Sequence, residues 1–174
     1  MFKKTAQHQP LAAFTLVEIL VTVTLTAIIM LGITSLFISF MMSAGKSRIS
    51  QSVRENGTVA MQRMIEELRN AKAINITATQ CNGSTVYSSL AFVNADDVAS
   101  SLAAASNRIR LNTGGSNYYL TSDSNQLRNL GFVCYNTEAA KYIEITFTLA
   151  SSTAIANSPI HSQLDFKSGV ALRN

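Results

Sequence analysis

Residues 14–42 read FTLVEILVTVTLTAIIMLGITSLFISFMM, an apolar run of 29 residues with a single charged side chain, Glu18. As an α-helix rising 1.5 Å per residue, the run would be about 43 Å long, whereas the hydrocarbon layer of a membrane is roughly 30 Å thick. The run therefore predicts a transmembrane helix. A charged side chain in such a helix is costly, so Glu18 is expected to have a partner and a function.

The segment before the apolar run, residues 1–13, is basic and polar and ends in two small residues, Ala12 and Ala13. An ordinary secretory signal peptide is cleaved after its apolar region, which is thereby removed. Here the small residues come first, so cleavage after Ala13 would retain the membrane helix and make Phe14 the new N-terminus. We expect residues 1–13 to be a leader of this kind.

The run Ala13–Leu20, AFTLVEIL, resembles the prepilin cleavage and methylation motif of type IV pilins and type II secretion pseudopilins. In that motif a small residue, usually glycine, is followed by Phe-Thr-Leu, an aliphatic residue and Glu. The resemblance implies that a prepilin peptidase cuts between Ala13 and Phe14 on the cytoplasmic side and methylates the new amine of Phe14. Alanine in place of glycine keeps the site small.

The resemblance also implies a partner for Glu18. In these families the glutamate is thought to pair with the positive N-terminal amine of a neighbouring subunit, and burying both charges together avoids two separate desolvation costs. Phe14 and Glu18 are one helical turn apart, so a contact within one subunit is a second way to satisfy the carboxylate before assembly. The alternative is an ordinary signal anchor that tolerates one glutamate.

Beyond the membrane run, residues 43–74 are predicted to extend the helix as an amphipathic segment. Positively charged and acidic side chains mostly occupy the other faces, with Arg63–Glu67 and Glu66–Arg69 at ion-pair spacing. Gly57 interrupts the pattern and indicates a bend or close packing. The apolar stripe, whose members recur at spacings of three and four, consists of Ile49, Val53, Gly57, Ala60, Met64, Leu68 and Ala71.

Residues 75–174 change to a strand-like pattern and are predicted to form a β-rich globular head. The expected strands are Thr85–Val93, Arg108–Leu111, Tyr118–Thr121, Leu130–Tyr135, Tyr142–Leu149 and Gln163–Leu172. The polar segments Ala95–Asn107 and Ser151–Ser162 are expected to be loops, with a short helix at Asp96–Ala105 as an alternative. The predicted class is α+β: a long N-terminal helix packed against an antiparallel sheet, which is the pilin fold that the resemblance implies.

The two cysteines, Cys81 and Cys134, lie far apart and lack the CxxC spacing of a redox or zinc site. A structural disulfide is the expected use, with two buried thiols as the alternative. The disulfide agrees with a head outside the cytoplasm. The leader charges Lys3 and Lys4 precede the first apolar segment and favour a cytoplasmic N-terminus, against Lys46 and Arg48 on the far flank.

Enzymatic chemistry finds little support in the sequence. His161 is the only histidine after the leader and lies in a polar loop near Pro159. No group of His, Cys, Asp or Glu residues has metal-ligand spacing. Asp96–Asp97 lacks the further oxygen ligands of a calcium loop, and Gly114–Gly115 is typical of a turn between strands. We expect no enzyme activity, no metal and no cofactor.

A nucleic-acid partner is weakly supported. The net charge of +4 is spread thinly along the chain. A DNA-binding surface would form if the fold brought cationic and stacking side chains together. The candidates are Arg108, Arg110, Arg128, Tyr118, Tyr119 and Tyr135. Strand tyrosines and scattered arginines are more often sheet packing and solubility.

The sequence therefore predicts a structural subunit of a type IV pilus or type II secretion-like filament. The run Asn56–Ala71 resembles the distal helix of larger minor pilins and pseudopilins, and Val170–Asn174 is similar to the tails of some prepilin-type proteins. Major pilins commonly have a helix-breaking proline where this chain has Ser35, which favours a minor subunit.

The implied partners are other pilin or pseudopilin subunits, prepilin peptidase and an inner-membrane assembly platform. The implied location is the cytoplasmic membrane with the head outside, and then an extracellular or periplasmic filament. Pilus function, secretion and competence for DNA uptake all stay open. The alternative functions are a signal-anchored monomeric binding protein outside the cytoplasm and a DNA-uptake or adhesion pilin whose head binds a ligand.

Overall fold

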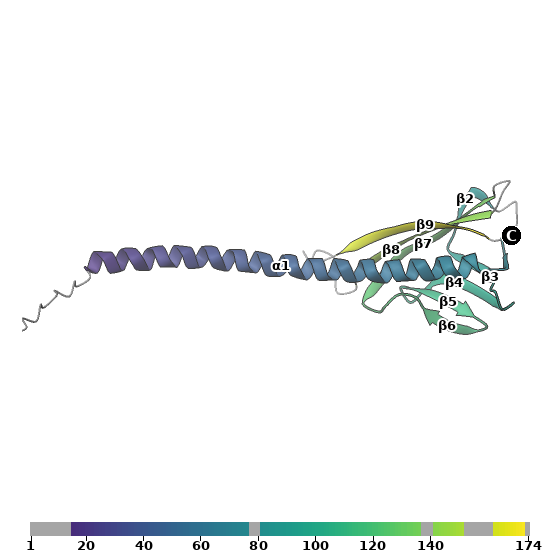
Figure 1. The fold of residues 1–174 in the computed structure, drawn as a ribbon, viewed down its shortest axis with the longest axis horizontal. Coiled ribbons are helices and arrows are strands. Elements are labelled where there is room, and N and C mark those ends of the chain that lie inside the picture. Colours follow the sequence, from purple (N-terminus) through teal and green to yellow (C-terminus); the bar gives the residue numbers. More distant parts are fainter. Residues whose placement is uncertain (1–14, 77–80, 137–140, 152–161, 173–174) are drawn as a thin grey trace, which may run out of the picture. The chain divides into compact units, whose positions relative to one another are not determined.

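The structure is a computed structural model that describes residues 15–76, 81–136, 141–151 and 162–172 (Figure 1). The chain divides into two compact units, Met1–Met41 and Met42–Asn174. A single α-helix, α1 (Leu16–Arg69), contributes its first part to one unit and its second part to the other.

The described part of the first unit is helical and predominantly apolar on its surface. Every residue from Thr15 to Met41 is exposed in the single chain, including Leu16 at 79% and Leu36 at 73%. This part of α1 is long and apolar enough to cross a membrane, which makes it a candidate membrane anchor. An exposed apolar surface of this extent requires lipid or a protein partner.

The second unit combines the end of α1 with two antiparallel sheets, so the α+β prediction is confirmed. The five-stranded sheet has the order β1-β3-β4-β5-β6, and the four-stranded sheet has the order β2-β7-β8-β9. Their strands are β1 (Ala73–Ile74), β2 (Asn82–Tyr87), β3 (Ser89–Val93), β4 (Ala99–Ala105), β5 (Arg108–Thr113), β6 (Ser116–Tyr119), β7 (Asn125–Asn136), β8 (Lys141–Ser151) and β9 (Gln163–Ala171).

The predicted helix stripe forms the centre of the second unit. Val53, Ala60, Met64 and Leu68 are fully buried, Gly57 is buried, and Ile49 is half-buried where the core ends. Residues from both sheets join the same core, among them Leu90, Leu102 and Ile109 from one and Phe132, Ile143 and Ile145 from the other. In Figure 1 the end of α1 accordingly runs between the two sheets. α1 stops at Arg69, and Ala73–Ile74 are already strand, so the helical extension ends before residue 74.

Close packing, and not a bend, explains Gly57. A Cβ atom at Gly57 would lie 2.0 Å from Cζ of Phe166 in β9, so only glycine lets that ring reach the helix. The Phe166 ring is in turn stacked on Phe147 of β8, with ring centroids 4.9 Å apart. The glycine therefore fixes how closely the four-stranded sheet approaches α1.

The segment Ala95–Asn107 is the main error of the sequence-based prediction, because it contains β4 in the middle of the five-stranded sheet. β4 pairs with β3 and β5, with Leu102 opposite Leu90 and Leu111. Its alanines and serines have weak strand preference, so their burial depends on neighbouring strands. Ser106 and Asn107, at φ of 51° and 58°, close the β4–β5 hairpin with the backbone of a type I′ turn.

Other strand boundaries also differ from the prediction; the expected strand Tyr118–Thr121, for example, is β6 at Ser116–Tyr119. The expected strand Thr85–Val93 is divided at Ser88 into β2 and β3, which belong to different sheets, so the head has two sheets where one was predicted. The expected strand Leu130–Tyr135 is the second half of a longer β7, which contains a register irregularity between Leu127 and Asn129. The backbone N–H of Leu127 donates to the carbonyl of Asn107 at 2.7 Å and connects the two sheets.

Candidate functional site

The first turn of α1 is closed by a side chain of the predicted cleavage motif. The backbone N–H of Glu18 donates to Oγ1 of Thr15 at 3.3 Å, so Thr15 is the N-cap of the helix. Thr15 and Glu18 also have the Thr-x-x-Glu spacing of a capping box, a local signal that the sequence-based prediction did not use. Ala13 and Phe14, the predicted cleavage and methylation residues, lie outside the described residues.

The Glu18 side chain is exposed in the single chain and surrounded by exposed apolar residues. Its neighbours Val17 and Ile19 are 69% and 54% exposed. Within residues 15–76 and the other described segments, no hydrogen bond or ion pair to its carboxylate is present. The Thr15 hydroxyl contacts the backbone N–H of Glu18 and not its carboxylate.

Threonine hydroxyls of the apolar helix, by contrast, are already satisfied by the helix itself. Each of four hydroxyls donates to a backbone carbonyl three or four residues earlier, at distances of 2.7 to 2.9 Å: Thr22 to Ile19, Thr24 to Val21, Thr26 to Thr22 and Thr34 to Met30. A hydroxyl bonded in this way can face lipid without losing a hydrogen bond. Glu18 is the one charged side chain in this part of α1, and its burial would still need an external partner.

The position of Glu18 in the first turn is not enough to compensate for burial. A carboxylate near a helix N-terminus gains about 0.3–1 kcal/mol from the helix dipole. Burial of an unpaired charge away from water costs several kcal/mol. Because the cost of burial exceeds the gain from the dipole, a cation that approaches Glu18 would be favourable wherever the helix is buried.

The head is held together at one end by a disulfide between Cys81 and Cys134. Their Cα atoms are 4.6 Å apart, both residues are buried, and the sequence separation is 53. Cys134 belongs to β7, and Cys81 directly precedes β2, the strand that pairs with β7. The structure thus has the bridge that the cysteine spacing predicts, and no described cysteine is free.

The cations and tyrosines of the weakly supported DNA surface are only partly brought together. Arg108, Arg110 and Tyr119 share one face of the five-stranded sheet, with Arg110 opposite Tyr119. Tyr118 lies on the other face, and Tyr135 belongs to β7 of the other sheet. A surface made of all the predicted residues is therefore absent.

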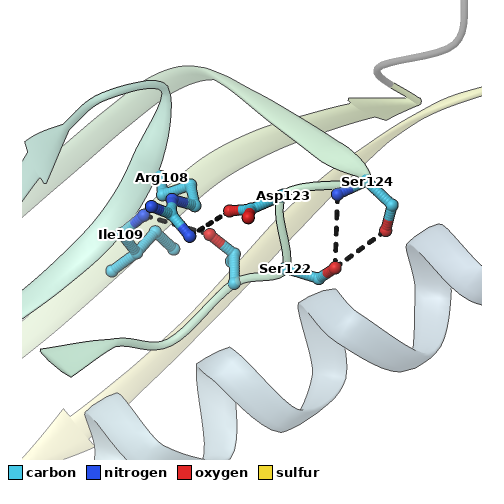
Figure 2. A network of polar contacts seen from close by, with 6 residues as sticks. Arg108, Ile109, Ser122, Asp123 and Ser124 are labelled. Carbon is cyan, nitrogen blue, oxygen red and sulfur yellow. Dashed lines mark hydrogen bonds and ion pairs between the residues drawn. The ribbon is translucent and has the colours of Figure 1, made fainter.

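Arg108 is already engaged within the protein (Figure 2). Its guanidinium carbon lies 3.8 Å from the centroid of the Tyr119 ring, and the same guanidinium forms an ion pair with Asp123. In Figure 2 Asp123 points toward Arg108 from a turn that is closed by Ser122 and Ser124. This arrangement fixes the end of β6 and leaves less cationic surface for a ligand.

The remaining sequence candidates occupy ordinary structural positions. Asp97 forms an ion pair with Lys72, and Gly114–Gly115 form the β5–β6 turn with φ of 58° and 86°. Arg63 pairs with Glu66 at 3.1 Å, where the sequence suggested Glu67. Among the described residues no group of three His, Cys, Asp or Glu side chains is placed to hold a metal, and His161 lies outside them.

Comparisons with known proteins give no relative for this chain. No family model, no curated protein and no solved structure matches it.

Proposed function

We propose that this chain is a structural subunit of a type IV pilus or a type II secretion-like filament, present as a minor pilin or pseudopilin and without enzymatic activity. Prepilin peptidase removes residues 1–13, and the apolar part of α1 holds the subunit in the cytoplasmic membrane with the head outside. The same helix then packs against other subunits on the assembly platform.

The observation that supports this proposal best is the contrast between Glu18 and the threonine hydroxyls that follow it. The threonine hydroxyls of the apolar helix donate to backbone carbonyls of the same helix, so they are compatible with lipid and with a helix-packed core alike. The Glu18 carboxylate has no partner in the described chain, and the new amine of Phe14 would supply one in a neighbouring subunit. A partner that exists only after cleavage links processing to assembly.

The architecture of the second unit is compatible with the same role. A helix covered by antiparallel sheets, with a disulfide closing one end, makes a rigid head that can be carried on a filament. A binding protein held by a signal anchor would share these features. The N-terminus therefore has to provide the test.

The deciding measurement is the mass of the mature chain, isolated from membranes of cells with and without prepilin peptidase. The proposal requires a chain that begins at methylated Phe14 when the peptidase is present and at Met1 when it is absent. An Ala13→Gly variant controls for the small residue and should be processed at least as completely. An intact Met1 in both strains would identify a signal-anchored monomer instead.

A further inference from the structure

A groove of about 350 Å³ opens between α1 and the edge of the five-stranded sheet in the second unit. Its size is at the lower end of the range of ligand-binding pockets. It has an apolar floor, an aromatic wall and a charged rim. The lining residues are Arg63 and Glu67 of α1, Asn94 and Asp96 of the β3–β4 turn, Leu111 and Thr113 of β5, and Tyr118 and Leu120.

The groove exists because the helix does not cover the last strand of the sheet. Leu111 of β5 and Tyr118 of β6 are register partners on the same sheet face. Leu111 is 8% exposed, whereas Tyr118 is 57% exposed. β6 is the edge strand, so the Tyr118 ring stays largely exposed while it lines the groove.

Two pairs of consecutive acidic residues lie at the groove, and in each pair one carboxylate forms an ion pair while the other lines the groove. Glu66 binds Arg63 at 3.1 Å, and Glu67 lines the groove. Of Asp96 and Asp97, the second binds Lys72 and the first lines the groove. Within the described residues, neither lining carboxylate has an ion-pair or hydrogen-bond partner, and the Arg63 guanidinium is already engaged by Glu66.

The turn that carries Asp96 is fixed by its own hydrogen bonds. Oδ1 of Asn94 accepts the backbone N–H groups of Asp96 and Val98 at 3.0 and 2.9 Å. Asp97 has a φ of 62°, and its ion pair with Lys72 ties the turn to the segment that follows α1. The backbone of Asp96 is therefore held at the rim of the groove.

We propose that this groove binds a lysine or arginine side chain of a neighbouring protein subunit. Two uncompensated carboxylates at one opening favour a cation, because they repel each other until one arrives. The leucine floor suits the methylene stem of a long basic side chain, whose charged end stays at the rim. The open tyrosine ring adds a cation–π contact. That the neighbour is a filament subunit depends on the proposed function; the preference for a basic side chain does not.

The binding test uses the full chain in detergent micelles, labelled with ¹⁵N, and titrates it with N-acetyl-lysine amide and N-acetyl-arginine amide. N-acetyl-norleucine amide, which lacks the charge, is the matched probe. We expect saturable shifts of the Asp96 and Tyr118 backbone signals with both cations and none with norleucine. No saturable shift with either cation, or equal binding of norleucine, would overturn the proposal.

Two variants separate the groove from the rest of the acidic surface. Glu67→Gln together with Asp96→Asn should weaken binding of the lysine probe about tenfold, as expected when a charged hydrogen-bond acceptor is lost. Glu55→Gln removes an exposed charge of α1 outside the groove and should change affinity less than about twofold, within the range of exposed pairs. Equal losses in both variants would mean only general attraction to an acidic surface. Unchanged signals of Leu102 and Ile109 verify that each variant is folded.

A photo-crosslinking residue in place of Tyr118 identifies the occupant in cells that assemble the filament. We expect crosslinks to a peptide of another filament subunit that contains a lysine or arginine next to the crosslinked position. Crosslinks to lipid alone, or none at all, would exclude a subunit as the occupant. The mass of the N-terminus is an independent readout, so a failed groove and a failed filament assignment are distinguishable.

Discussion

Gly57 and Phe166 lie so close that no other residue fits at position 57: a Cβ there would lie 2.0 Å from Cζ of the Phe166 ring. The ring cannot move aside easily, because its other side is stacked on Phe147 at a centroid distance of 4.9 Å. The contact determines the distance between α1 and the four-stranded sheet, and it explains a glycine inside a helix that local preference alone would disfavour.

Gly57→Ala is therefore expected to destabilise the head although alanine is the better helix former. The intrinsic gain is about 1 kcal/mol, and overpacking of a core typically costs about 1–3 kcal/mol. The net loss should appear as a lower midpoint of chemical denaturation, followed by the near-ultraviolet circular dichroism of the tyrosines.

Gly45→Ala is the matched control for that variant. Gly45 also lies within α1, but a Cβ there would meet nothing within 4 Å. It should be neutral or stabilising by up to about 1 kcal/mol. A Gly57→Ala protein as stable as the Gly45→Ala protein would show that the sheet adjusts without cost.

Reduction of the disulfide between Cys81 and Cys134 is expected to lower the stability of the head. The bridge has a sequence separation of 53. For a loop of that size, the chain-entropy model gives about 4 kcal/mol of stabilisation, and measured bridges are typically about 2–4 kcal/mol. Cys81→Ser with Cys134→Ser should lower the free energy of unfolding by an amount in this range. Equal stability with and without reductant would contradict this expectation.

Substitutions in the β4–β5 turn are expected to increase the stability of the head. Ser106 and Asn107 both have positive φ, and the type I′ turn prefers Asn followed by Gly. Replacing Ser106 by Asn and Asn107 by Gly should stabilise the head by about 1 kcal/mol, because the new residues adopt this backbone at less cost. The hydrogen bond between Leu127 N–H and the carbonyl of residue 107 uses only backbone and should persist. A drop in stability would mean that the native side chains contribute contacts of their own.

Because of the ion pair between Lys167 and Glu144, the stability of the head is expected to decrease at alkaline pH. Its atoms Nζ and Oε1 are 2.9 Å apart, and the hydrogen bond from Lys167 to Glu144, followed by the charge of Glu144, raises the pKa of Lys167 above 10.5. A group with a raised pKa stabilises the fold fully below its unfolded pKa, and the contribution is lost as pH rises through the folded pKa. Glu144→Gln should return the pKa of Lys167 toward its ordinary value, as followed by NMR of its Cε protons. An unchanged titration would show that the pair does not persist in solution.

The regular elements can be predicted from the sequence because each carries its own signal. Strict alternation around Ile143, Ile145 and Phe147 predicts β8, and these residues are buried as expected. Val53, Ala60 and Met64 recur at helical spacing and predict the helix stripe. Residues such as these form a core in almost any arrangement of neighbouring elements.

The features that the sequence does not predict depend on contacts between distant residues. β4 has little pattern of its own, and its alanines and serines become a central strand only because β3 and β5 lie on either side. The groove needs Glu67 and Asp96 to approach from different elements, which no spacing in the sequence indicates. Thr15 is different, since its Thr-x-x-Glu spacing with Glu18 is a local signal of a helix start.

Glu18→Ala tests the role of the one charged side chain in the apolar part of the helix. The variant should insert into membranes at least as well as the wild type, because it removes the one charged side chain from the apolar part of the helix. Incorporation into filaments should fall strongly, because the amine of Phe14 in the neighbouring subunit would be buried without its partner. Insertion is measured by carbonate extraction of membranes, and incorporation by the amount of chain in sheared filaments.

Thr26→Val provides the control for a polar side chain in the same helix. The Thr26 hydroxyl donates to the Thr22 carbonyl at 2.7 Å, so its loss leaves no group that seeks a partner in another subunit. Both insertion and incorporation should stay close to wild type. If Glu18→Ala subunits enter filaments as well as Thr26→Val subunits do, then Glu18 is not an assembly contact, and the link between leader cleavage and assembly has to be sought elsewhere in the chain.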